Sequence, residues 1–180
     1  GFASGVEPLL LDPKTRERVL PLVESASKPE LIDAMAKVAR TGRVLSHRRR
    51  AVQWLGRFGR HESIRALATL LDDPSLRKDA LFSMARSPGS AAHAHLSKRL
   101  RAAKAGSDTE RDLLRACVLR AQRRGQIVAG LKKRLTRALA GEHPDDRAVG
   151  SYGLAALDSE QRARLLLHQD PVLVIAAARA

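Results

Sequence analysis

The sequence predicts an all-α protein built from repeated pairs of helices. Apolar residues recur at helical spacing along most of the 180-residue chain, as in Leu96, Leu100 and Ala103. No stretch alternates apolar and polar residues as a half-buried strand would. Hydrophobic residues make up 44% of the chain but aromatic residues only 3%, so the core must consist mainly of Ala, Leu and Val. Such a core favours closely packed helices.

A short pattern recurs along the chain at an interval of about 30 residues, which suits two helices and is too short for three. Arg-Ala-Val at residues 50–52 returns as Arg-Ala-Cys at 115–117 and again as Arg-Ala-Val at 147–149. Between residues 50–52 and 115–117, Ala80 and Leu81 repeat the apolar part of this pattern. We therefore expect an array of helix pairs in which each pair packs on its neighbours.

Residues typical of helix ends divide this array into elements. Asp-Pro dipeptides at 12–13, 73–74 and 170–171 place an N-cap acceptor before a proline at the first helical position, where its missing N–H costs nothing. Ser107 and Glu110 have the spacing of a capping box. Helices are expected over residues 13–25, 29–41, 47–58, 62–71, 74–86, 90–104, 108–123, 127–140, 144–156, 159–168 and from 171 onward.

One stretch resembles a known repeat. Residues 47–81 read HRRRAVQWLGRFGRHESIRALATLLDDPSLRKDAL, with a basic and apolar first segment ending in Leu-Gly, a leucine-rich second segment and an Asp-Pro start to the next. This resembles the short HEAT-type repeat, related to the repeats of phycobilin-lyase-like proteins. The resemblance is good over residues 46–87, fair over 142–180 and weak elsewhere. It implies a right-handed α-solenoid of about five HEAT-like helix pairs, and it implies no single function, because this fold serves many.

The expected array occupies residues 12–180, and residues 1–11 are expected to be an N-terminal extension or an expression remnant. The last residues, 171–177, match the opening of a repeat but lack its second helix. They are also apolar, whereas a terminal repeat usually carries a polar capping face. The sequence thus suggests a fragment of a longer protein, with dimerisation through this end as the alternative.

The formal net charge of +14 comes from two segments. Residues 43–60 contain six arginines and no acidic residue, and residues 98–137 contain thirteen Lys or Arg against three acidic residues. On the later helices these cations are expected on the side away from the leucines. The residues expected to bind a partner are Arg48, Arg49, Arg50, Lys98, Arg101, Lys132, Lys133 and Arg137. The alternative is a solvated helix face in an arginine-rich chain.

Little in the sequence points to catalysis. The six histidines are scattered, and no HExxH or paired-cysteine motif offers metal-ligand spacing, so no catalytic residue, metal or cofactor is expected. Trp54 and Cys117 are both expected in the core. A single cysteine cannot form an internal disulfide, which indicates a reducing cytoplasmic compartment. No apolar run approaches the length of a membrane span.

These observations predict a non-enzymatic HEAT-repeat scaffold that binds an acidic protein partner through a basic surface. The alternative is sequence-independent binding of nucleic acid, in which the same cations contact phosphates. An enzymatic function based on iron would require a bound metal.

Overall fold

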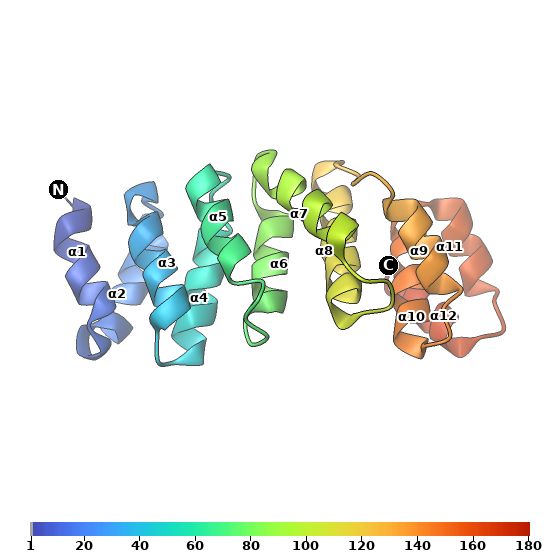
Figure 1. Cartoon of the computed structure of the whole chain (residues 1–180), viewed down its shortest axis with the longest axis horizontal. Coiled ribbons are helices and arrows are strands. Elements are labelled where there is room, and N and C mark those ends of the chain that lie inside the picture. Colours follow the sequence, from blue (N-terminus) through green and yellow to red (C-terminus); the bar gives the residue numbers. More distant parts are fainter. Residues whose placement is uncertain (1) are drawn as a thin grey trace. The chain divides into compact units, whose positions relative to one another are not determined.

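The computed structural model describes the backbone of residues 2–180 and the side chains from Ser4 onward, and this part of the chain forms helices and no strand (Figure 1). The chain divides into two compact units, Gly1–Ala92 and His93–Ala180, here called unit 1 and unit 2. The helices that begin before residue 90 are α1 (Phe2–Leu11), α2 (Pro13–Ala26), the short 3₁₀ helix η1 (Pro29–Leu31), α3 (Ile32–Thr41), α4 (Leu45–Leu55), α5 (His61–Thr69) and α6 (Arg77–Arg86). The later helices are α7 (Ala91–Ala102), α8 (Asp108–Arg124), α9 (Leu131–Leu139), α10 (Pro144–Leu157), α11 (Ser159–Leu166) and α12 (Pro171–Ala178).

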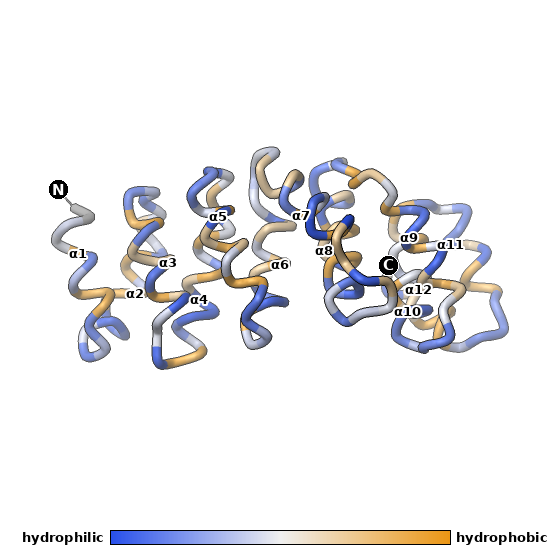
Figure 2. The backbone as a smooth tube through the Cα atoms, viewed as in Figure 1, coloured by the Kyte–Doolittle hydropathy of each residue, from blue (hydrophilic) through white to orange (hydrophobic). Residues whose placement is uncertain are grey.

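Unit 1 is built from two layers of helices. In one layer α3 packs between α1 and α5, and in the other α4 packs between α2 and α6. Consecutive helices pack across the layers, as α1 does on α2, α3 on α4 and α5 on α6. In Figure 2 hydrophobic and hydrophilic stretches alternate along these helices, as expected when each buries one side and exposes the other.

Trp54 on α4 lies at the centre of the core of unit 1, as the sequence predicts. Its ring is almost fully buried beside Phe58, with ring centroids 4.6 Å apart, and its indole N–H donates to the carbonyl of Val23 at 3.2 Å. A ring held in this way serves packing between α2 and α4. It does not offer a stacking platform for a base.

In unit 2, α10 is the central helix and packs on α8, α9, α11 and α12. Its contact with α9 is so close that glycine is required at one position. A Cβ at Gly150 would lie 2.3 Å from the backbone nitrogen of Leu139, well inside contact distance. Leu96 and Leu100 of α7 and Leu131 and Leu135 of α9 are buried, as the sequence predicts, whereas Leu139 at the end of α9 is half-buried.

The eleven expected helices are all present, but α9 begins at Leu131 and not at residue 127, and two further differences lie in unit 1. Residues 2–11 form an additional helix, α1, that packs on α2 and α3, with Leu10 fully buried. Helix α6 begins at Arg77 and not at Pro74. The carboxylate of Asp73 accepts hydrogen bonds from the backbone N–H and the hydroxyl of Ser75, at 2.9 and 2.6 Å, so it stabilises a turn that precedes the helix.

Across residues 2–180, every helix is too short or too polar to cross a bilayer.

Candidate partner-binding site

The first of the predicted partner-binding residues, Arg48 on α4, is held by groups within unit 1. Its Nη2 lies 2.5 Å from a carboxylate oxygen of Asp73, and its Nε donates to the carbonyl of Ala39 at 2.7 Å. Only 19% of its side chain is exposed. The hydroxyl of Ser75, followed by Arg48, lowers the pKa of Asp73 to about 2. Arg48 therefore links the end of α3 to the turn before α6.

The next two arginines of α4 are paired as well. Arg49 lies 3.2 Å from Asp79 of α6, and Arg50 makes two hydrogen bonds with the carboxylate of Glu24 of α2, at 2.9 and 2.6 Å. The hydrogen bond to Glu24 raises the pKa of Arg50 against the opposing effect of burial. The sequence predicts that all three arginines bind a partner, but in the structure each lies beside a carboxylate of unit 1. We interpret them as links between neighbouring helices.

In unit 2, Arg134 of α9 fixes the position of α9 beside the end of α7. Its guanidinium donates to the carbonyls of Arg101 and Ala103, at 3.1 and 3.3 Å, and also pairs with Glu110 of α8. The last carbonyls of a helix have no partner within it and carry partial negative charge, so a guanidinium is favourable there. One side chain thus holds three segments of unit 2 together.

Glu110 is the buried acceptor of this arrangement, with only 4% of its side chain exposed. One carboxylate oxygen lies 2.5 Å from Arg134 and 2.5 Å from Arg137, and the other accepts the backbone N–H of Gly106 at 2.8 Å. Ser107 caps α8 by accepting the N–H of Glu110, as the capping-box spacing predicts. In a capping box the carboxylate would accept the N–H of Ser107. The carboxylate of Glu110 instead accepts the N–H of Gly106 and pairs with the two arginines, which the local spacing does not predict.

The remaining candidates lie on α7 and α9 with their charges exposed. No ion pair or hydrogen bond joins the side chains of Lys98, Arg101 or Lys133 to another described residue. Arg137 is half exposed, although it pairs with Glu110. These four residues, Lys98, Arg101, Lys133 and Arg137, are called the basic face below. Lys132, the neighbour of Lys133 in the sequence, has its Nζ 3.7 Å from a carboxylate oxygen of Asp158, the residue that caps α11. This pair is longer than that of Arg137 with Glu110 and therefore weaker.

A hollow of about 240 Å³ lies next to Arg137. Small residues leave the space open, and Glu110 and Asp146 contribute carboxylates to its wall. Asp146 is paired with Arg111 at 2.7 Å, and the hydrogen bond between them raises the pKa of Arg111. Each of the two carboxylates therefore has an arginine other than Arg137, because Glu110 pairs with Arg134 and Asp146 pairs with Arg111.

The structure bears on two groups that catalysis could use, clusters of metal ligands and the thiol of Cys117. Among residues 2–180, no group of three or more His, Cys, Asp or Glu side chains could hold a metal ion. Cys117 of α8 is fully buried, and burial raises the pKa of its thiol to about 12. A thiol in this environment stays protonated at neutral pH, and only the thiolate is a good nucleophile.

Comparison with known proteins gives the fold and no function. No protein-family model matches the chain. No curated protein matches it either. One similar solved structure is the crystal structure of an engineered protein from the Northeast Structural Genomics Consortium, which is 19% identical over all of this chain and 95% of its own, with a TM-score of 0.50. At this identity the likeness concerns the helical fold alone.

Proposed function

We propose that this protein is a non-enzymatic scaffold that binds an acidic segment of another protein through the basic face of unit 2. The observation that carries the proposal is the difference in pairing between candidate cations. Arg48, Arg49 and Arg50 are bound by carboxylates of their own unit, whereas Lys98, Arg101 and Lys133 are exposed without such partners among the described residues. Unpaired cations on α7 and α9 attract an anionic partner and increase its association rate.

Arg137 is the residue best suited to anchor an acidic side chain. Glu110 keeps Arg134 and the N–H of Gly106 as hydrogen-bond donors when Arg137 turns to a partner. A guanidinium has five N–H donors, so Arg137 can bind an incoming carboxylate in a bidentate manner. The hollow beside it offers space for that carboxylate. A short acidic side chain bound there would be shielded from solvent more than one at the exposed lysines.

The fold itself supports a scaffold. We propose that the helices form HEAT-like pairs arranged within each unit as in a right-handed solenoid, because consecutive helices of unit 1 alternate between two layers. Repeat proteins of this kind expose long faces for partners. The single cysteine, which is buried and free, is compatible with a reducing cytoplasmic compartment.

The test uses the full chain and a fluorescently labelled glutamate-rich peptide, with binding followed by fluorescence anisotropy. We expect Lys98→Glu, Arg101→Glu and Lys133→Glu together to weaken binding by at least about tenfold. A matched control makes the same charge change at three exposed cations of unit 1, by Lys14→Glu, Arg18→Glu and Arg43→Glu. Equal loss in both proteins would show that only net charge matters, and would contradict a specific face.

Binding of nucleic acid is the second candidate, and the composition of the basic face favours it in one respect. The face contains cations and no aromatic or large apolar side chain, and phosphate contacts require no such anchor. A duplex DNA titration at several salt concentrations separates the two functions. Binding to phosphates should lose affinity with a slope of about −0.9 per contacted phosphate in a plot of log affinity against log salt. DNA bound more tightly than the acidic peptide, with that slope, would replace the protein partner by nucleic acid.

A further inference from the structure

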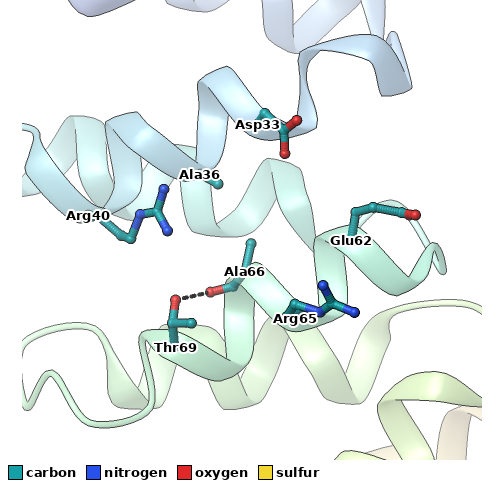
Figure 3. Close-up of a pocket in the computed structure, with 7 residues that line it drawn as sticks. All are labelled: Asp33, Ala36, Arg40, Glu62, Arg65, Ala66 and Thr69. Atoms are coloured by element: carbon teal, nitrogen blue, oxygen red, sulfur yellow. Dashed lines mark hydrogen bonds between the residues drawn. The ribbon is translucent and has the colours of Figure 1, made fainter.

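A second hollow, of about 190 Å³, lies in unit 1 between α3 and α5 (Figure 3). These two helices pack beside each other in the same layer. The residues that line the hollow are Asp33, Ala36 and Arg40 of α3 and Glu62, Arg65, Ala66 and Thr69 of α5. It is separate from the basic face, because every residue that forms it belongs to unit 1.

The charged side chains that line this hollow, Asp33, Arg40, Glu62 and Arg65, are not paired with each other. None of the four forms an ion pair or a hydrogen bond with another described residue. In the other layer of the same unit, Arg49 and Arg50 both find a carboxylate on a neighbouring helix. Charges on neighbouring helices are paired in both layers, as Lys37 of α3 is with Glu7 of α1, but the four charges that line the hollow are not. The charges of the hollow remain available to an external group.

The two carboxylates of the hollow lie toward one end, with Arg65 near them, and Arg40 lies toward the other end. Asp33 and Glu62 lie in the first turns of α3 and α5, and Arg40 lies in the last turn of α3. Figure 3 shows Asp33 and Glu62 on one side of Ala36 and Ala66, and Arg40 together with Thr69 on the other side. Seven residues separate Asp33 from Arg40, which corresponds to about 10 Å along the helix axis. Arg65 lies on the α5 side, near the acidic end.

Small side chains make the middle of the hollow accessible. Ala36 is buried and Ala66 is half-buried, and neither extends beyond its Cβ. The hydroxyl of Thr69 donates to the carbonyl of Ala66 at 2.8 Å and so is held close to its own helix. A peptide backbone or a short side chain could lie over the two alanines while its charged neighbours reach the ends.

We propose that this hollow docks a peptide segment of a protein partner that presents one basic and one acidic side chain about 10 Å apart. The basic side chain lies between Asp33 and Glu62, and the acidic side chain meets Arg40. A spacing of about 10 Å corresponds to three residues of an extended segment or seven of a helix. The basic face selects for negative charge, whereas this hollow selects for the order of two opposite charges.

The test is selection of peptides from a random display library on the full chain, compared with a variant in which the charges are exchanged by Asp33→Lys, Glu62→Lys and Arg40→Glu. We expect the unmodified protein to enrich peptides with a basic and an acidic residue three or seven positions apart in one order, and the exchanged variant to enrich the opposite order. Enrichment of the same order by both proteins, or of acidic peptides alone, would overturn the proposal.

A second variant tests the hollow without altering charge. Ala66→Leu fills its floor with a larger side chain and should reduce binding of an enriched peptide at least about tenfold. Undiminished binding by Ala66→Leu would contradict docking over the alanines. The triple substitution of Lys98, Arg101 and Lys133 to Glu serves as the control, because it should abolish binding through the basic face and leave selection by the hollow unchanged. The two proposals can therefore fail independently.

Discussion

The arginines of α4 in unit 1 and the cations of α7 and α9 in unit 2 share one sequence signal and differ in structure. Both groups come from segments with many Lys and Arg and few acidic residues. Around α4 the acids arrive from neighbouring helices, as Glu24 from α2 and Asp79 from α6. In unit 2 the available acids of α8 bind Arg111, Arg134 and Arg137, which leaves Lys98, Arg101 and Lys133 unpaired. A run of charge thus stays unpaired, and is a candidate binding surface, only where neighbouring helices do not neutralise it.

The largest expected effect on stability concerns the buried acid beneath the basic face. Glu110→Ala removes the acceptor of two arginines and the partner of the Gly106 N–H. Removing one member of a buried ion pair leaves charge without compensation, so we expect unfolding free energy to fall by about 3 kcal/mol. Urea denaturation measures this. Asp112→Ala on the same helix, which removes a longer pair with the exposed Arg115, should cost less than about 1 kcal/mol. A loss that small for Glu110→Ala would show that the acid is not structural.

A smaller effect separates the two groups of cations directly. Arg48→Ala loses the pair with Asp73 and the hydrogen bond to Ala39, in a largely buried setting, and should cost about 1.5 kcal/mol. Lys98→Ala removes an exposed, unpaired charge and should change stability by less than about 0.5 kcal/mol. Thermal and urea unfolding of the two variants gives the comparison. Equal costs would remove the distinction between structural and surface cations.

The smallest effect is a pH dependence in unit 1. Because the folded protein holds the pKa of Asp73 at about 2, below its usual value of 3.8, the ionised carboxylate stabilises the fold above about pH 4. This contribution is lost as the pH falls from about 4 to 2, and it amounts to about 1 kcal/mol for a partly exposed pair. Asp73→Asn should be less stable than the unmodified protein at pH 6 by about this amount, with the difference shrinking toward pH 2. A difference that does not change with pH would contradict the assignment.

Much of the fold could be predicted because it depends on local sequence signals. Periodic leucines, Asp-Pro starts and the cap at Ser107 predicted eleven helices, and Asp12 and Asp170 cap α2 and α12 as expected. Helix α1 was not predicted, because Gly5 and Pro8 weaken its intrinsic helix propensity and its packing on α2 and α3 is a tertiary effect.

The candidate site was less predictable, because pairing across helices depends on which side chains the fold brings together. Asp73 lies 25 residues from Arg48 and Glu110 lies 27 residues from Arg137, and nothing in local spacing relates them. The unpaired charges of α3 and α5 were missed for the same reason. The sequence shows only that Asp33 and Arg40 share one helix and that Glu62 and Arg65 share another. That these two helices, α3 and α5, pack side by side is known only from the structure.

The most direct test of the account neutralises each group of cations and measures binding to the glutamate-rich peptide. One variant carries Arg48→Gln, Arg49→Gln and Arg50→Gln, and the other carries Lys98→Gln, Arg101→Gln and Lys133→Gln, so both lose the same charge. We expect the first variant to be less stable but to bind the peptide as the unmodified protein does. We expect the second to be equally stable but to bind at least about tenfold more weakly. Loss of binding in the first variant with retention in the second would contradict both expectations.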